Sequence, residues 1–170
     1  MNLVMRAMRK LSLRQRIALT GAAAFAVIAT ALASEIYGGL IPCALCLKQR
    51  VPYYLALPLL GVAYAYAPRA PLAARGLLVT IGVVFLIGAG LGIYHAGIEY
   101  GSWAGPATCG GGAGLANSTD ALFKALQSGS MVRCDAPAWT LFGISLAGYN
   151  ALASLGLAML ALSTGNKETA

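Results

Sequence analysis

The chain has 170 residues, of which 59% are hydrophobic and 10% are charged, and it carries a formal net charge of +7. With a mean hydropathy of +0.74, this balance excludes an ordinary soluble domain, in which about a quarter of the residues are charged. Because each helical crossing of a bilayer takes about 20 apolar residues, several crossings would use nearly the whole chain and leave little for a separate soluble domain.

Four apolar stretches lie along the chain, and each is long enough to cross a bilayer as a helix. They cover residues 17–36, 51–67, 77–96 and 139–162. We therefore expect an all-α fold, an integral membrane four-helix bundle that forms one domain over residues 1–170. The second stretch holds Pro52, which suits a first helical turn, and Pro58, which should bend the helix unless neighbouring helices satisfy the freed carbonyl.

The first stretch has a second interpretation. A basic tail, an apolar run and Ala31-Leu32-Ala33 before Ser34 are also features of a signal peptide with a small-residue cleavage site. The run is longer than a signal core of about 7 to 15 residues, which favours a membrane span. Cleavage would leave every cysteine in the chain, so the functional interpretation is the same in either case.

The distribution of Lys and Arg predicts the orientation, because cytoplasmic loops retain these residues. Eight lie on one side of the predicted spans: Arg6, Arg9, Lys10, Arg14, Arg16, Arg69, Arg75 and Lys167. Four lie on the other side: Lys48, Arg50, Lys124 and Arg133. Both termini should thus be cytoplasmic, and the loops 37–50 and 97–138 should be external. The basic residues form no stripe interleaved with aromatics, so no nucleic-acid partner is expected.

All four cysteines lie in the two external loops, Cys43 and Cys46 in the short one and Cys109 and Cys134 in the long one. Thiols outside the cytoplasm meet an oxidising compartment, so an even number indicates disulfides. Two structural disulfides are one interpretation. A Cys-x-x-Cys pair, however, closes so small a loop that it adds little chain-entropy stabilisation, and such pairs are more often redox-active or metal-binding.

Other cysteine chemistries fit the spacing less well. A four-cysteine zinc site would need two short-spaced pairs, whereas 24 residues separate Cys109 from Cys134, so we expect no metal. Covalent haem attachment requires His after the second cysteine, where this chain has Leu47. A Cys/His hydrolase is disfavoured, because the single histidine, His95, lies at the outer end of the third stretch and no orienting acid is marked near it.

The first cysteine pair has surroundings suited to thiolate chemistry, since Lys48 and Arg50 follow it and a helix is expected to begin there with its positive dipole end. Arg50 lies four residues after Cys46, so the two share a helix face if the helix has started by Cys46. A guanidinium there would stabilise a thiolate or a reduced acceptor that carries oxygen. The alternative is a basic residue that anchors a helix end at the headgroups.

The two external loops differ in reach. The short loop holds Cys43 and Cys46 at the membrane surface, where electrons can leave into the lipid phase. The long loop can extend to a soluble protein and can also fold back over the first pair. Within it, Asn117–Ser128 is expected to form a short helix on the membrane interface, with Asn117 as its cap.

Three features of the sequence together carry a family resemblance: Pro42-Cys43-Ala44-Leu45-Cys46-Leu47-Lys48-Gln49-Arg50, two further loop cysteines, and Cys134-Asp135-Ala136-Pro137-Ala138-Trp139 before a Gly-Ile-Ser span. They resemble the DsbB family of membrane thiol oxidases, over essentially the whole chain. The order of the pairs is specific, because the related vitamin K epoxide reductase family places its Cys-x-x-Cys after its loop pair. Two features depart from the family. Gln49 stands where some members carry an acid, and a glycine-rich run follows Cys109.

The resemblance implies a route for electrons. A reduced DsbA-like periplasmic protein with a thioredoxin fold would attack the Cys109–Cys134 disulfide, with Cys109 forming the mixed disulfide. Cys134 would pass the electrons to the Cys43/Cys46 pair through a transient link to Cys43. Cys46 would lie against a membrane quinone, ubiquinone or menaquinone, that is reduced to quinol. A DsbA-type disulfide is itself strongly oxidising, at about −120 mV, so a quinone is a suitable acceptor.

The resemblance also extends to the quinone site. Arg50 matches the quinone-side arginine of the family, and His95 lies near the position of a third-helix histidine of that site. The alternative for His95 is a packing or anchoring role at the membrane edge. We therefore interpret the chain as a quinone-dependent dithiol oxidase of the bacterial inner membrane. The leading alternative is a non-enzymatic membrane scaffold with two structural disulfides. A transporter subunit is disfavoured, because no ionisable residue lies deep within a predicted span.

Overall fold

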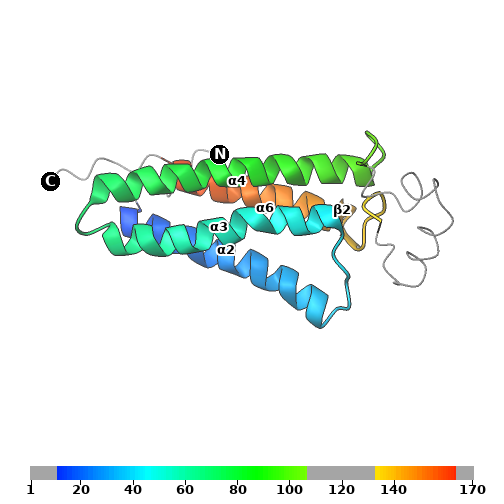
Figure 1. Ribbon diagram of the computed structural model, residues 1–170, viewed down its shortest axis with the longest axis horizontal. Helices are drawn as coiled ribbons and strands as arrows, with labels where there is room; N and C mark the ends of the chain where they lie inside the picture. Colours follow the sequence, from blue (N-terminus) through cyan, green and yellow to red (C-terminus); the bar gives the residue numbers. More distant parts are fainter. Residues whose placement is uncertain (1–10, 107–132, 164–170) are drawn as a thin grey trace, which may run out of the picture.

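The computed structural model describes residues 11–106 and 133–163, and within them the chain forms four helices that run alternately up and down one elongated bundle (Figure 1). The helices are α2 (Leu13–Ile36), α3 (Ala44–Tyr66), α4 (Pro71–Glu99) and α6 (Leu146–Leu162), and the strands β1 (Thr140–Leu141) and β2 (Ile144–Ser145) precede α6. Helix α4 packs against both α3 and α6, and α2 packs mainly against α3. The prediction of a mostly helical chain is confirmed.

Each helix begins at a residue that suits the unpaired N–H groups of a first turn. Ser12 caps α2 in a capping box, and Ser145 caps α6 through its hydroxyl. Pro71 starts α4, where its missing N–H costs nothing. Helix α3 is capped by the sulfur of Cys43. The first cysteine pair therefore lies at a helix N-terminus, as the sequence predicts.

Helix α3 begins earlier than the sequence predicts. Because Cys43 serves as its cap, residues 44–50, which were expected in the external loop, are helical. Pro52 consequently lies inside the helix instead of in its first turn, and the helix continues through both Pro52 and Pro58. Cys46 is thus already part of a helix.

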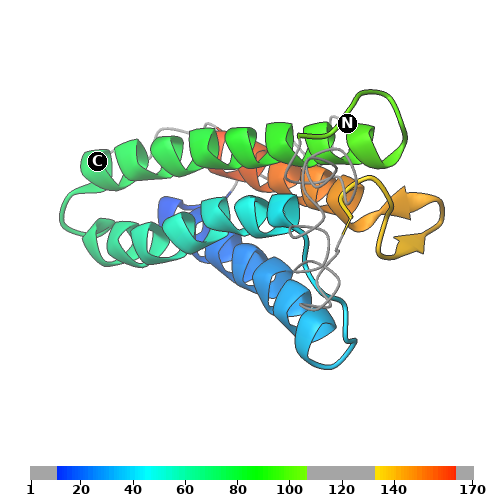
Figure 2. The same ribbon diagram turned by 45° about the vertical axis from the view of Figure 1, so that its right-hand side comes forward.

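The last helix begins later than the sequence predicts, at Leu146 instead of near Trp139. Strands β1 and β2 form an antiparallel hairpin whose two turn residues, Phe142 and Gly143, have φ angles of 50° and 77°. Positive φ at both central positions is typical of a type I′ turn, and glycine adopts it without steric cost. The hairpin extends beyond the start of α6 (Figure 2).

Small residues let α4 approach its neighbours closely. A Cβ added to Gly92 would lie 2.9 Å from the backbone of Ala151 in α6, and one added to Gly88 would lie 3.2 Å from the ring of Pro52 in α3. Helices in lipid commonly use such contacts, because small residues allow backbones to pack tightly. The same buried face of α4 continues to His95, so this packing also turns His95 toward α3 and α6.

Two helices, α2 and α4, are long and apolar enough to cross a membrane, and α6 is a shorter apolar helix. Large apolar side chains remain exposed along the bundle, among them Phe25 on α2, Ile87 on α4 and Leu152 on α6. An apolar surface of this kind indicates contact with lipid. The predicted helix Asn117–Ser128 lies outside the described residues.

Candidate active site

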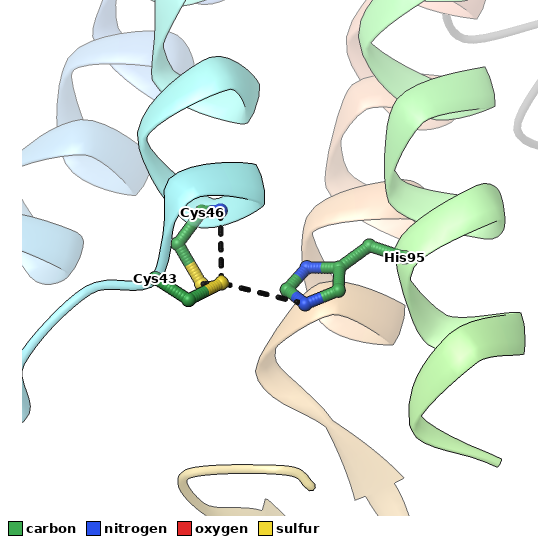
Figure 3. A group of neighbouring side chains, drawn as sticks. All are labelled: Cys43, Cys46 and His95. Atoms are coloured by element: carbon green, nitrogen blue, oxygen red, sulfur yellow. Dashed lines mark hydrogen bonds between the residues drawn. The ribbon is translucent and has the colours of Figure 1, made fainter. Parts of the chain in front are cut away.

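Cys43 and Cys46 are free thiols, and they lie together at the start of α3 (Figure 3). Their Sγ atoms are 3.2 Å apart. Cys43 adopts an extended backbone just before the helix, so its sulfur turns back and accepts the backbone N–H of Cys46 at 3.3 Å. A sulfur in this position lies at the positive end of the helix dipole, and this positive charge stabilises the thiolate over the thiol.

The surroundings of the pair place the negative charge on Cys43. The thiol of Cys46 is the strongest influence, because it donates to the Cys43 sulfur. His95 and the Cys46 backbone N–H act in the same direction against the opposing effect of burial, and together they lower the pKa of Cys43 to about 4. The same contact with Cys43, together with burial, raises the pKa of Cys46. Cys43 is therefore ionised at neutral pH, and the remaining thiol proton lies on Cys46.

His95 comes from the last two turns of α4, 52 residues away along the chain, and its ring points at the first pair (Figure 3). Its Nε2 lies 3.6 Å from the Cys43 sulfur. The residue is 1% exposed, so it is part of the interior and does not anchor a membrane edge. The sequence placed His95 near the site only through the family resemblance, whereas the structure brings it into contact with Cys43.

A chain of polar side chains leads from His95 into the bundle. Gln49 Nε2 lies 2.6 Å from His95 Nδ1, and Asn150 donates to the Gln49 carbonyl oxygen at 2.6 Å. The Tyr53 hydroxyl donates to Asn150 at 2.8 Å and also lies 2.8 Å from the hydroxyl of Ser154. Buried polar groups that are satisfied in this way fix the orientation of one another, so the network holds the imidazole in place. Gln49, a departure from some family members, is its first link.

Glu99 is a site residue that the sequence reasoning missed. It lies one helical turn after His95, with an Oε1–Nε2 distance of 3.8 Å, and its side chain is 5% exposed. Its other oxygen, Oε2, has no hydrogen-bond partner among the described residues. The expectation that no acid stands near His95 is therefore wrong. The four-residue spacing on a helix was the signal that could have indicated the pair.

Arg50 does not act as predicted on Cys46. Its Nη1 pairs with the carboxylate of Glu35 at 2.6 Å, and the Arg50 side chain is 13% exposed. The two residues join the start of α3 to the end of α2, which diverges from the bundle in this region (Figures 1 and 2). The main influences on the pKa values of Cys43 and Cys46 do not include Arg50: Cys46 and His95 lower the pKa of Cys43, and Cys43 and burial raise the pKa of Cys46.

Cys134 lies in the same buried cluster as Cys43, together with Leu45 and Ile98, and Cys46 packs against this cluster. It is disulfide-bonded and 1% exposed. Next to it, Arg133 and Asp135 form an exposed ion pair, with the Arg133 guanidinium donating to both carboxylate oxygens. Cys109 lies outside the described residues. The fold thus brings one cysteine of the long loop to the first pair.

The site also has the donors of a metal centre. The ligand atoms of Cys43, Cys46 and His95 all lie within 4.8 Å of one another. The sequence led us to expect no metal, because that expectation compared only the spacings between cysteines. Thiolate and imidazole donors at this separation can hold a zinc-type cation.

A bundle with membrane-capable helices, which holds an ionised Cys-x-x-Cys thiol at a helix N-terminus and a third cysteine beside it, has the features of a membrane protein for thiol–disulfide chemistry. The chain belongs to the DsbB family: residues 13–164 match the family described as Disulfide bond formation protein DsbB. This is a membrane family of disulfide-forming oxidoreductases, which confirms the resemblance noted in the sequence. Comparison with curated proteins and with solved structures finds no match.

Proposed function

We propose that this protein is a thiol:quinone oxidoreductase that regenerates the disulfide of a DsbA-like periplasmic protein. The observation that carries the proposal is the shared cluster of Cys43, Cys46 and Cys134 at one end of the bundle, with Cys43 ionised. A structural disulfide would not need a low-pKa thiolate held by His95. An electron relay between two cysteine pairs requires both features.

The donor is oxidised at the long-loop pair. A thiolate of the reduced donor attacks Cys109, so that the Cys109–Cys134 disulfide breaks and Cys134 leaves as a thiolate. The second donor thiol then attacks the mixed disulfide, which releases the oxidised donor and returns Cys109 to a thiol. One disulfide forms and one is reduced, so two electrons now reside on Cys109 and Cys134.

The electrons then pass to the first pair. The Cys134 thiolate attacks Cys43 of an oxidised Cys43–Cys46 pair, and Cys46 leaves with the electron pair. Resolution of the Cys43–Cys134 link by Cys109 restores the long-loop disulfide and leaves the first pair as two thiols. Free thiols at Cys43 and Cys46 are the state that the proposed cycle expects at this point. Burial of Cys134 with Cys43 supports the direct exchange.

A membrane quinone supplies an acceptor for two electrons and two protons, and ubiquinone and menaquinone share this chemistry. Arg50 is suited to bind a quinone, because only Nη1 of its guanidinium donates to Glu35. The other N–H groups of the guanidinium remain as donors for a quinone oxygen. The adjacent surface of α3 is apolar and exposed at Leu47, Val51 and Tyr54. A lipid-soluble molecule could therefore reach Cys46, which is only partly buried. His95 positions the Cys43 sulfur from the opposite side.

The proposal includes a location. The chain would lie in a bacterial inner membrane with four crossings, with both termini cytoplasmic and the cysteine-bearing end of the bundle in the periplasm. The excess of Lys and Arg on the opposite side supports this orientation. The donor protein would then meet the long loop from the periplasm, while the quinone pool lies in the lipid beside α3.

Trapping of the donor tests the proposal. A reduced DsbA-like protein that lacks its second active-site cysteine should attack the Cys109–Cys134 disulfide and stay joined to Cys109, while Cys134 leaves as a thiolate, because this donor has no second thiol with which to release itself. The complex should be visible on a non-reducing gel after acid quenching and absent from the matched Cys109→Ser variant, which holds no long-loop disulfide. A scaffold with two structural disulfides predicts no complex with either protein, and trapping that depends on Cys43 instead of Cys109 would reverse the order of electron flow.

A further inference from the structure

We propose that the reduced Cys43–Cys46 pair, together with His95 and Glu99, forms a site for one zinc-type divalent cation, and that this cation holds the pair in its reduced state. Binding itself is independent of the quinone chemistry proposed above, and only its effect on the relay rests on that chemistry. Three donors that lie within 4.8 Å of one another carry the inference, namely the sulfurs of Cys43 and Cys46 at the start of α3 and the imidazole of His95 near the end of α4. The Glu99 carboxylate lies beside the imidazole and adds a fourth candidate donor.

The distances fit a tetrahedral ion. With Zn–S bonds of about 2.3 Å and Zn–N bonds of about 2.0 Å, two sulfur ligands lie about 3.8 Å apart, and a sulfur and a nitrogen lie about 3.6 Å apart. In the structure the two sulfurs are 3.2 Å apart, and Cys43 Sγ lies 3.6 Å from His95 Nε2. The distance between Cys43 Sγ and His95 Nε2 is therefore already the one that a bound ion needs, whereas the two sulfurs need to separate by about half an ångström. All three ligand atoms lie within 4.8 Å of one another, so the remaining sulfur–nitrogen distance needs to shorten by about 1 Å at most.

Glu99 provides a fourth ligand and an independent reason for a cation. Its carboxylate lies 3.8 Å from the same His95 Nε2, it is almost fully buried, and its Oε2 has no partner among the described residues. A buried carboxylate oxygen without a partner is costly. A cation between the imidazole and the thiolates would supply that partner, and a site of two Cys, one His and one Glu is within the range of ligands that zinc accepts.

The polar network behind His95 can support a metal-bound imidazole. A metal on Nε2 requires the ring proton on Nδ1, and such a proton commonly points at a carbonyl or carboxylate oxygen. If the Gln49 and Asn150 amides turn over, Gln49 accepts from Nδ1 and donates to Asn150, and Asn150 donates to Tyr53, which in turn donates to Ser154. Every atom in the chain keeps a partner at the distances observed. The network is thus compatible with both proton arrangements of the imidazole.

A cation bound here would compete with electron transfer. Its bonds occupy the sulfur lone pairs of Cys43 and Cys46, so neither sulfur can attack a disulfide or give electrons to an acceptor while the metal is bound. An oxidised pair has no thiolates and cannot bind it. With excess zinc in the periplasm, the protein would consequently accumulate in the reduced, inactive state. Removal of the metal would restore electron transfer.

Metal titration of the reduced full-length protein in detergent tests the site. Zn²⁺ alone, in competition with a chromophoric chelator, should bind at one ion per chain. Co²⁺ alone should give thiolate charge-transfer bands and the visible bands of a tetrahedral site. Glu99→Gln and His95→Gln each remove a direct ligand, so each should weaken binding by at least the roughly ten- to hundredfold that loss of an outer-shell partner alone causes. Asp135→Asn, which removes an exposed carboxylate outside the cluster, should bind as tightly as the parent protein.

Two results would overturn the proposal: no stoichiometric Zn²⁺ or Co²⁺ on the reduced protein, or binding that is equally tight in the His95 and Glu99 variants, which would mean that the dithiol alone holds the metal. Quinone reduction measured in the same samples separates the two proposals. With chelator present, its rate reports the proposed function alone. Loss of that rate on addition of one equivalent of Zn²⁺, and its return with chelator, reports the metal.

Discussion

The pKa of Cys43 gives a quantitative test of the site. Three donors converge on its sulfur, namely the Cys46 thiol, the Cys46 backbone N–H and the His95 ring, and they hold the pKa at about 4. A hydrogen bond to a charged group is worth about 1.5–3 kcal/mol, which is about one to two pKa units. Cys46→Ala removes one donor and should raise the Cys43 pKa to about 5–6. At pH 5 the ionised fraction of Cys43 should then fall from about 90% to about 10–50%.

The assay is the rate at which iodoacetamide alkylates Cys43, followed by mass spectrometry of its peptide between pH 3 and 9. Because only the thiolate reacts, a lowered pKa gives a rate that is constant above about pH 6 and falls on acidification through the pKa. Cys46→Ser keeps a hydroxyl donor, so its midpoint should remain below that of Cys46→Ala. A midpoint near 8.5 in Cys46→Ser, the value of an ordinary thiol, would refute the assignment of the charge to Cys43.

Three further changes test the packing, the quinone side and the orientation. Gly92→Ala should destabilise the bundle by about 1–3 kcal/mol and lower its melting temperature in detergent, because the added Cβ would lie 2.9 Å from the Ala151 backbone. Gly90→Ala is the control: its added Cβ would have nothing within 4 Å, so the melting temperature should be almost unchanged. Arg50→Ala should raise the apparent KM for quinone about ten- to a hundredfold. Arg50→Lys should also raise this KM, because lysine lacks the planar guanidinium that can hold a quinone oxygen. Unchanged quinone kinetics in a well-inserted Arg50→Ala protein would instead indicate that Arg50 anchors the helix end. After reduction, every cysteine that an impermeant thiol reagent reaches should be labelled from the periplasm, and labelling from the cytoplasm alone would invert the orientation.

Much of the helical architecture could be predicted because lipid leaves few choices for an apolar chain. A long apolar stretch must satisfy its backbone internally, so the stretches 17–36 and 77–96 predict helices. Helix α2 begins before the first stretch and ends with it, and α4 extends the other stretch at both ends. The start of α3 was less predictable. Cysteine is not a typical capping residue, and Pro52 resembled a first-turn proline. The hairpin before α6 depends on backbone angles at Phe142 and Gly143, which an apolar run does not reveal.

The sequence predicted the cysteines of the candidate site, but only some of the residues around them. The Cys-x-x-Cys spacing indicates redox chemistry because the two sulfurs lie within one helical turn, a local property. The contact between Cys43 and His95 joins residues 52 positions apart, and it depends on how α3 and α4 pack around small residues. The partner of Arg50 is on a different helix for the same reason. A local face argument paired it with Cys46, whereas tertiary packing pairs it with Glu35.

Quinol formation is the most direct measurement of the proposed function. Purified full-length protein, a reduced thioredoxin-fold donor and a ubiquinone or menaquinone analogue are mixed with chelator, and quinol absorbance and donor disulfide are followed together. We predict one quinol for each donor disulfide formed over many turnovers, with turnover lost in Cys43→Ser, Cys46→Ser, Cys109→Ser and Cys134→Ser. Donor disulfide that never exceeds the protein's own cysteine pairs, with no quinol formed, would contradict a quinone-dependent oxidase.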